Sequence, residues 1–381
     1  MARMLAILIT FFFLLTACED SESALPDSIE QPPSSDQSQD SGDTENEVMT
    51  ITPLMISNGE DVQFIDWTSN EEVIYISSYN GESSINLYNL VSGENNPLFI
   101  TQGFIQIVEV SPDKEQLLVQ VSSIDHEATL HILALNGKQL STINIPSSEI
   151  YMDWNEKNPS QILVTSFSED WSFQSYLWNI ETSELTTLQI EQPFSEWIGE
   201  ESLQYLDWNV EQPELLAPLK RMDLDSNDLS VVTKDIYYTK SYGDWFFTLA
   251  PSSQNEDKGV YQFYNATSGQ IGSFTAFHLN RFSEWVVPYH DFVESENRFY
   301  FFQPLEGGDI DFYEEDFVLS SYSLTNGDTN IVMEGLENKP LQCSPNGGYC
   351  LYGYQLEQVI SIQSGKVTSL ISEGIKKADA M

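Results

Sequence analysis

The chain has 381 residues, of which 59 are acidic and 15 basic, and its formal net charge is −44. Proteins that bind nucleic acids need lysine and arginine to displace the counterions of the phosphates, so this charge excludes that class of partner. It also opposes contact between the folded part and an anionic membrane surface, whereas cationic ligands, metal ions and basic protein surfaces are compatible with it.

Residues 1–17 have the pattern of a secretion signal. Arg3 precedes an apolar run from Leu5 to Leu15, which is long enough for a signal peptide and shorter than the roughly 20 apolar residues of a membrane-spanning helix. The run ends in Leu-Thr-Ala-Cys18, which resembles the lipobox of bacterial lipoproteins. The resemblance implies that Cys18 becomes the first mature residue and carries fatty acyl groups such as palmitate, although Cys18 could also follow an ordinary secretory signal by chance. We therefore expect a protein anchored by lipid to the cell membrane on its extracytoplasmic side.

Residues 18–47 are expected to form a disordered tether. Ten acidic and no basic residues lie between Glu19 and Glu47, among Ser, Gln and Pro with few apolar side chains. Such a segment cannot bury enough surface to offset its ordering entropy, and its charges keep it extended.

From residue 48 to residue 375 the chain is predicted to be all β. Short runs rich in β-branched and aromatic residues alternate with turn signals, and no helical pattern of convincing length interrupts them. Hairpin turns recur at intervals of 38 to 46 residues, with one longer interval of 58 residues between Ser268 and Asn326. These turns are Ser92-Gly93, Asn136-Gly137, Thr182-Ser183, Asn227-Asp228, Ser268-Gly269, Asn326-Gly327 and Ser364-Gly365.

A second marker repeats with the same period. Trp67, Val110, Trp154 and Trp197 are 43, 44 and 43 residues apart, and weaker equivalents lie near Ser241, Phe292 and Cys343. A period of this length with four short strands per unit is typical of a β-propeller blade. We count seven blades; six is the alternative, because residues 207–233 diverge from the repeat and the long interval indicates an insertion. Residues 48–56 are expected to add an outer strand to the last blade and so close the ring, and residues 376–381 form a C-terminal tail.

A lipobox, an acidic tether and blades that end in Ser-Gly or Asn-Gly hairpins together resemble the YqgU-like β-propeller lipoproteins of Gram-positive bacilli. The resemblance covers nearly the whole chain and depends on architecture more than on a diagnostic motif. It implies a propeller, which we associate with six blades in that family, and a place at the membrane. It supplies no activity and no site residues.

Two acidic segments are candidates for calcium binding. Asp223, Asp225 and Asn227 match the first oxygen ligands of a calcium loop, but Asp228 stands where that motif has Gly and Lys234 where it has Glu, so a solvated turn is the simpler interpretation. The second candidate lies in the insertion, where loops often carry function. It consists of Asp309, Asp311 and Glu314. No other cofactor is expected.

Cys343 and Cys350 flank the turn sequence Ser-Pro-Asn-Gly-Gly. A hairpin there would place the two side chains opposite each other, so a disulfide is plausible outside the cytoplasm. Two unbonded, small apolar residues in a strand pair are the alternative.

The aromatic residues divide into two groups. Trp67, Trp154 and Trp197 occupy the repeat and are expected to pack between blades. Trp171, Trp208 and Trp285 lie outside the repeat and are the candidates for ligand contacts in exposed loops.

No motif of a hydrolase elbow, zinc protease, phosphate loop or dinucleotide site is present. His290-Asp291 and Asp125-His126 are adjacent pairs, and adjacent side chains on a strand point to opposite faces, so neither is a convincing catalytic pair. The sequence therefore favours a non-catalytic module that binds an envelope protein or peptide, as a scaffold or accessory factor. An extracytoplasmic hydrolase or lyase with a site at the channel and a cation-dependent surface sensor are the alternatives. Carboxylates or a histidine at the channel mouth would favour an enzyme, and an aromatic or apolar rim would favour binding.

Overall fold

The computed structural model describes residues 49–122, 127–209, 211–212, 214–282 and 284–373. The chain divides into two units, Met1–Val48 and Met49–Met381. The predicted signal peptide, the lipid site at Cys18, the tether and the C-terminal tail lie outside the described residues. Within those residues no helix is long and apolar enough to cross a membrane.

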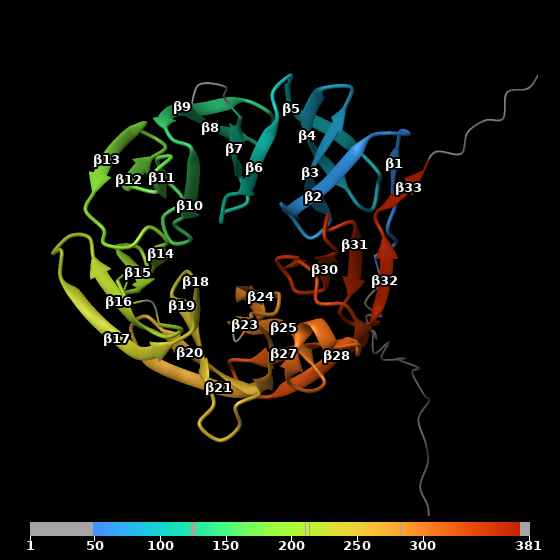
Figure 1. Ribbon diagram of the computed structural model, residues 1–381. Coiled ribbons are helices and arrows are strands. Elements are labelled where there is room, and N and C mark those ends of the chain that lie inside the picture. Colours follow the sequence, from blue (N-terminus) through green and yellow to red (C-terminus); the bar gives the residue numbers. More distant parts are fainter. Residues whose placement is uncertain (1–48, 123–126, 210, 213, 283, 374–381) are drawn as a thin grey trace, which may run out of the picture. The chain divides into compact units, whose positions relative to one another are not determined.

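The second unit consists of seven four-stranded antiparallel sheets placed in chain order around one axis (Figure 1). This confirms the prediction of an all-β propeller. The strands are β2 (Asp61–Trp67), β3 (Glu72–Tyr79), β4 (Glu82–Asn89) and β5 (Asn95–Thr101) in blade 1; β6 (Ile105–Val110), β7 (Gln116–Val121), β8 (Glu127–Ala134) and β9 (Gln139–Pro146) in blade 2; β10 (Glu149–Trp154), β11 (Gln161–Phe167), β12 (Phe173–Asn179) and β13 (Glu184–Leu188) in blade 3; β14 (Glu196–Ile198), β15 (Ser202–Leu206), β16 (Ala217–Asp223) and β17 (Leu229–Ile236) in blade 4; β18 (Tyr238–Tyr242), β19 (Trp245–Pro251), β20 (Lys258–Asn265) and β21 (Gly269–Phe277) in blade 5; β24 (His290–Val293), β25 (Arg298–Pro304), β27 (Phe317–Ser323) and β28 (Thr329–Leu336) in blade 6; and β29 (Leu341–Cys343), β30 (Tyr349–Tyr352), β31 (Gln358–Ser361) and β32 (Lys366–Ser369) in blade 7.

The burial of each strand follows its place in the blade. The first strand of each blade lies nearest the axis and the fourth lies at the periphery (Figure 1). The second strand of blade 3, β11, reads QILVTSF and is buried at six consecutive positions, because neighbouring blades cover both of its faces. The outermost strand β13 of the same blade has no buried residue. The sheets therefore form one continuous core by stacking.

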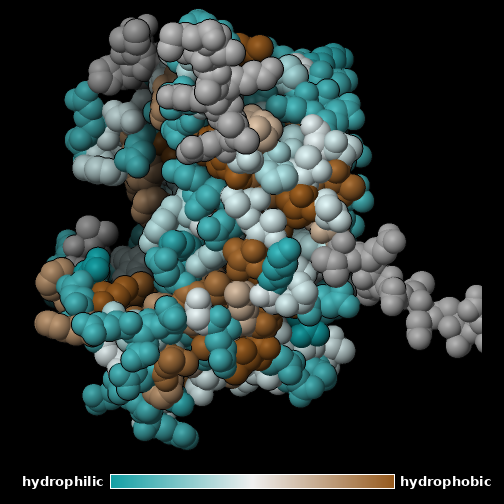
Figure 2. All heavy atoms as spheres, turned by 90° about the vertical axis from the view of Figure 1, so that its right-hand side faces the viewer, coloured by the Kyte–Doolittle hydropathy of each residue, from teal (hydrophilic) through white to brown (hydrophobic). Residues whose placement is uncertain are grey.

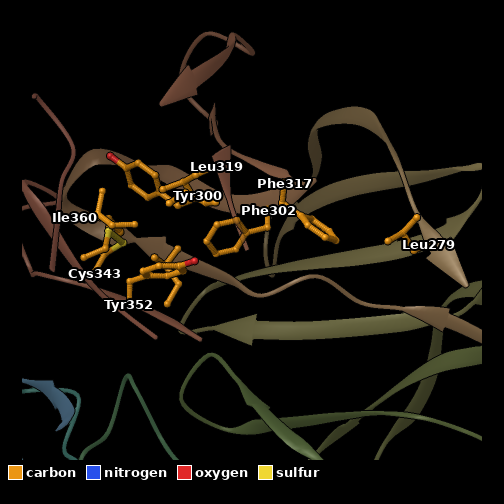
Figure 3. Close-up of a cluster of buried hydrophobic side chains, with 12 residues drawn as sticks. Leu279, Tyr300, Phe302, Phe317, Leu319, Cys343, Tyr352 and Ile360 are labelled. Carbon is orange, nitrogen blue, oxygen red and sulfur yellow. A yellow bond between two sulfur atoms is a disulfide. The ribbon is translucent and has the colours of Figure 1, made fainter. Parts of the chain in front are cut away.

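Large aromatic side chains fill the space between blades. Trp67, Trp154 and Trp197 are at most 3% exposed, which confirms that the tryptophans of the repeat belong to the core. Between blades 6 and 7, Tyr300 and Phe302 of β25 lie near the residues of blade 7 (Figure 3). Burying surface of this kind contributes about 25 cal/mol per Å² of apolar area, so the packing of blade on blade is the main source of stability.

The ring closes differently from the prediction. β1 (Leu54–Ile56) pairs in parallel with β33 (Ile371–Glu373), the strand after β32, and the two form a separate two-stranded sheet. In the described part of the segment 48–56, β1 therefore lies outside the sheet of blade 7, whose four strands all come from the C-terminal part of the chain. On the side of the domain that carries β1 and β33, hydrophilic residues are interspersed with separate hydrophobic patches (Figure 2).

The long interval between hairpins contains additional structure around blade 6. β22 (Leu279–Arg281) pairs with β23 (Glu284–Val286) and with β26 (Gly308–Asp309) in a small three-stranded sheet. The short 3₁₀ helix η2 (Ile310–Phe312) follows β26 in this insertion, whereas a second 3₁₀ helix, η1 (Glu294–Glu296), lies in the turn between β24 and β25, at the other end of the blade. The segments before β24 and after β25 thus form one insertion at the same end of blade 6.

Cys343 and Cys350 lie directly opposite each other on β29 and β30 and are joined by a disulfide. Cys350 is fully buried and Cys343 nearly so. The sulfur atoms lie in the core between blades 6 and 7 (Figure 3). The bond therefore fixes the hairpin that completes the ring.

We predict that the double substitution Cys343→Ser/Cys350→Ser lowers the free energy of unfolding by about 2 kcal/mol, since the bond restricts the unfolded chain. Chemical denaturation measures the change. Reductant should destabilise the wild type and leave the double variant unaffected. Equal stability of the two proteins under oxidising conditions would contradict the prediction.

Candidate functional site

A cavity of about 580 Å³ lies on the axis of the propeller. Its wall comes from the innermost strands of blades 1, 2, 3, 5, 6 and 7 and from the turns that follow some of them. The residues that line it are Ile65, Asp66, Val108, Glu109, Val110, Pro112, Lys114, Asp153, Trp154, Glu156, Tyr238, Lys240, Tyr242, His290, Asp291, Phe292, Glu294 and Gln342. Six of them are acidic and two are lysines, so the cavity has an excess of negative charge.

One position of the repeat supplies most of the polar wall. It is the position directly before each repeat marker, on the innermost strand of every blade. Because neighbouring side chains of a strand project to opposite faces, this side chain lies on the other side of the sheet from the buried marker. In blade order the seven residues are Asp66, Glu109, Asp153, Glu196, Lys240, Asp291 and Gln342. We refer to them as the channel ring.

Three carboxylates of the channel ring bind the next blade. The backbone N–H of Trp197 donates to Asp153 Oδ2 over 2.6 Å, that of Ser241 to Glu196 Oε2 over 2.9 Å, and that of Cys343 to Asp291 Oδ2 over 2.6 Å. In each case the donor is the marker residue of the following blade. These acidic groups therefore have a structural role, because they pair backbone donors at the unpaired inner edge of the sheets.

Two marker tryptophans reinforce the same contacts. The indole N–H of Trp197 donates to the backbone carbonyl of Asp153 over 3.1 Å, and that of Trp67 to the carbonyl of Gln342 over 2.9 Å. The second bond joins blade 1 to blade 7. The repeat thus encodes a blade-to-blade contact in two consecutive residues.

Two lysines neutralise part of the ring. Lys114 Nζ lies 2.8 Å from Asp66 Oδ2. Lys240 Nζ lies 2.8 Å from Glu196 Oε1 and 3.9 Å from Asp153 Oδ1. Burial opposes the charge of Lys240, but these carboxylates outweigh it and hold the pKa of Lys240 well above its usual value.

Glu109 differs from the other acidic members of the channel ring. Within the described part of the chain, its carboxylate has no hydrogen bond and no ion pair. Burial raises its pKa to about 8, and the charges of Asp153 and Asp66 act in the same direction, against the opposing effects of Lys240 and Lys114. Glu109 is therefore an unoccupied acceptor in the wall of the cavity, and it is mostly protonated at neutral pH.

Two other acids of the ring are shifted in the same direction. Burial raises the pKa of Asp291 to about 7, although the N–H groups of Cys343 and Phe292 oppose the shift. Burial raises the pKa of Asp153 to about 6, with Lys240 opposing. The cavity therefore gains negative charge as the pH rises through the neutral range.

The turns after the innermost strands form the mouth of the cavity. Glu156 and Lys157 follow β10, and Lys157 reaches other blades: its Nζ lies 3.1 Å from Asp244 Oδ2 and 3.9 Å from Glu294 Oε1. Charged side chains therefore meet across the opening from blades 3, 5 and 6.

His290 also lines the cavity, but its imidazole does not form a catalytic acid–base pair with the carboxyl group of Asp291. Its Nδ1 lies 2.8 Å from the carbonyl of Pro288, and its ring packs against Phe247 and Tyr238. Burial lowers its pKa to about 4. The imidazole is thus neutral at physiological pH, and it lies among aromatic rings.

The comparisons with known proteins agree with this architecture. The model of the YqgU-like 6-bladed β-propeller domain family matches residues 89–353. The chain belongs to this family. A Bacillus subtilis relative described as uncharacterized lipoprotein YqgU is 25% identical over 365 residues, which is 96% of each chain. The crystal structure of the uncharacterized protein lmo1340 from Listeria monocytogenes has a TM-score of 0.78 at 23% identity and covers 86% of this chain and 100% of its own. The β-propeller domain of the trilobed protease from Pyrococcus furiosus has a TM-score of 0.54 at 12% identity, covering 82% of this chain and 98% of its own.

The blade number distinguishes this YqgU-like propeller from the description of its family. The family is described with six blades, whereas the described residues of this chain form seven four-stranded sheets. The count of seven from the sequence repeat agrees with the sheets.

The two predicted calcium segments have different local structures: Asp223 ends β16 and the next residues form a turn, whereas Asp309 lies in β26 and Asp311 in η2. Asp223 Oδ1 accepts hydrogen bonds from the backbone N–H and the hydroxyl of Ser226. Asp309 Oδ1 accepts from the N–H of Asp311, which also forms an ion pair with Arg281. Across the described ranges, no group of three or more His, Cys, Asp or Glu side chains is arranged to hold a metal ion. Calcium binding at Asp223, Asp225 and Asn227 or at Asp309, Asp311 and Glu314 stays a prediction.

The three tryptophans outside the repeat have different environments. Trp171 is 68% exposed in the loop after β11, and its ring contacts Phe167. Trp208 is half-buried in the loop after β15. Trp285 is not in an exposed loop: it lies half-buried on β23, and its ring stacks on that of His278 at 4.9 Å. The structure does not bring the three together, and none of them lines the cavity.

Sequence reasoning missed the channel ring. Its signal was present, because every member directly precedes a marker that the repeat had identified. The acids at those positions were not grouped, since Lys240 and Gln342 interrupt the acidic pattern and the later markers are irregular.

We predict that Glu109→Gln stabilises the fold at pH 8 by about 2 kcal/mol and changes it little at pH 5. The pKa of Glu109 is higher in the folded protein than in the unfolded chain, so the wild type loses stability as the pH rises from about 4.5 to about 8. Each unit of pKa shift corresponds to about 1.4 kcal/mol of lost stability. Water in the cavity solvates the ionised carboxylate and reduces this loss. Urea denaturation at the two pH values tests this, with exposed Glu184→Gln as control. The same stability difference at both pH values would show that no shifted carboxyl is involved.

Proposed function

We propose that the chain is a lipoprotein anchored through Cys18 to the extracytoplasmic side of the cell membrane, and that its propeller binds a positively charged group of an envelope protein or peptide in the central cavity. The lipobox pattern and the name of the Bacillus subtilis relative support the anchor. The acidic cavity supports the binding role.

The observation that carries this proposal is Glu109. Asp153, Glu196 and Asp291 each accept a backbone N–H of the next blade, and Asp66 is paired with Lys114. Glu109 occupies the equivalent position without such a partner in the described residues. Glu109 is half-buried, and an unpaired carboxyl in such a place is held in its neutral form by partial loss of solvent. A cationic ligand would stabilise the ionised form and supply the partner that the protein does not.

The rest of the wall suits a lysine or arginine side chain. The cavity volume lies within the roughly 300 to 1,000 Å³ that is usual for ligand sites. Tyr238, Tyr242 and Phe292 add aromatic surface, which attracts cations through the ring faces. The acidic mouth would attract a basic segment before it enters.

A hydrolase or lyase is the second candidate function. Six acidic residues and His290 do converge on the cavity, and a carboxyl with a pKa of about 8 is a suitable proton donor at neutral pH. However, three carboxylates of the ring hold adjacent blades together, and His290 is packed among aromatic rings. The contacts of these groups therefore favour binding over catalysis.

We predict that short peptides with one lysine or arginine bind the cavity and release close to one proton at pH 7. A cation favours the ionised form of Glu109, which is mostly protonated at that pH, so the affinity should rise about tenfold between pH 7 and pH 9. Isothermal titration calorimetry in buffers of different ionisation enthalpy measures both effects. A peptide with norleucine in place of lysine is the matched uncharged ligand.

The variant Glu109→Gln should weaken binding at least about tenfold at pH 9 and reduce proton release, whereas Glu184→Gln should change neither. Release that remains would come from other cavity acids with raised pKa values, among them Asp291 and Glu156. Binding of the norleucine peptide with equal affinity, or unchanged proton release by Glu109→Gln, would refute the cationic site.

The anchor has a separate test. We predict that a clickable fatty acid analogue labels the wild-type protein in growing cells and does not label Cys18→Ser, because the thiol of Cys18 is the acyl acceptor. The double variant Cys343→Ser/Cys350→Ser should be labelled like the wild type. Equal labelling of Cys18→Ser would disprove lipidation at this residue.

A further inference from the structure

The two most exposed large apolar side chains of the described residues are both in the insertion of blade 6. Phe282 is 88% exposed and Phe312 is 84% exposed. Leu305 and Tyr289 in the same connections are 54% and 42% exposed. Single exposed apolar residues are common on protein surfaces, but a group of them in one insertion indicates a site of interaction.

The small sheet of the insertion places the two phenylalanines on one surface. β22 and β26 pair in parallel, with Asn280 opposite Asp309. Arg281 Nη2 and Asp311 Oδ1, the residues directly before Phe282 and Phe312, are 2.9 Å apart. The pairing and the salt bridge therefore hold the two aromatic residues near each other, although they are 30 positions apart in sequence.

The backbone of Phe282 supports the same interpretation. Its φ is 54°, in the left-handed region that bulky residues rarely adopt. It stands at the turn between β22 and β23, where Gly or Asn would adopt this conformation without strain. The turn thus presents an aromatic ring to solvent at a local energetic cost.

Negative charge surrounds these apolar residues. Among the described residues of the segments that form the surface, 279–282, 284–286 and 305–316, Arg281 is the one basic residue. The acidic residues of the two segments are Glu284, Glu306, Asp309, Asp311, Glu314, Glu315 and Asp316. All seven have exposed side chains. We refer to this surface, Phe282, Leu305 and Phe312 with these acids, as the insertion patch.

We propose that the insertion patch docks a basic, amphipathic segment of a partner protein, with apolar side chains on Phe282 and Phe312 and lysine or arginine side chains on the surrounding acids. Charge complementarity selects this occupant. An anionic lipid surface would be repelled, and so would the identical patch of a second copy. Aromatic anchors with a charged rim are the usual composition of such interfaces.

This surface is independent of the cavity. β24 runs from the insertion to the turn that contains Glu294, and β25 returns from that turn to the insertion. The mouth of the cavity and the insertion patch therefore lie at opposite ends of the strands of blade 6. A variant of one site should leave the other unchanged.

The test uses the full-length lipidated chain and two amphipathic helical peptides, one of leucine and lysine and one of leucine and glutamate. The leucine–lysine peptide should bind, and Phe282→Ser/Phe312→Ser should weaken it at least about tenfold. The variant Glu314→Gln/Glu315→Gln should weaken it severalfold and reduce its salt dependence. Ile331→Ser, an exposed apolar position on the outer strand β28, should bind like the wild type. The phenylalanine variant should cause the same weakening in a Glu109→Gln background, in which binding of the peptide's lysines to the cavity is reduced.

Photo-crosslinking in intact cells provides the second readout. A benzoylphenylalanine at position 282 or 312 should capture the same protein, identified by mass spectrometry and carrying a basic amphipathic segment, and one at position 331 should not. Equal binding of the leucine–glutamate peptide, no effect of the phenylalanine variant, or capture of lipid alone or of a second copy of this chain would overturn the proposal.

Discussion

The inner edge of each blade presents backbone N–H groups that no further strand can pair. In a closed ring of sheets these donors face the axis, where burial makes an unpaired donor costly. This chain supplies an acidic side chain from the preceding blade at three of the seven junctions, through Asp153, Glu196 and Asp291. Much of the negative charge in the channel is therefore a consequence of how the blades are joined.

That constraint separates structural acids from available ones. A carboxyl group that accepts the N–H of the next blade is committed to its junction, and Lys240 balances two of these groups at once. Glu109 has the same place in the repeat without the same bond, so its charge is not required by the fold. The proposal that the cavity binds a cationic group depends on this difference between Glu109 and the equivalent acids of the other blades. The number of carboxylates in the cavity does not by itself distinguish them.

The sequence allowed the architecture to be predicted because a propeller repeats its packing. Trp67, Trp154 and Trp197 recur at the period of the blades, and their burial follows directly from that role. Closure was harder to foresee: pairing of Leu54 with Ile371 joins residues at the two ends of the domain, and no local pattern specifies such a partner. Trp285 was misjudged because the sequence did not indicate the β22–β23 hairpin, which stacks its ring on His278 and packs it against the core of blade 5. Which side chains meet in the site depends on the distances between blades, and the period of the sequence repeat does not specify these distances.

For a protein anchored at its amino end, as proposed above, the parallel pair of β1 and β33 would bear mechanical load. β1 begins at Leu54, shortly after the segment that would lead to the membrane, and it is bonded to the strand that ends the domain. Along the chain, tension from an anchor would reach this pair before it reached any blade. The junction of blades 1 and 7, which Trp67 and the carbonyl of Gln342 also hold, would then carry the force first, and the binding surfaces elsewhere on the ring would be shielded from it.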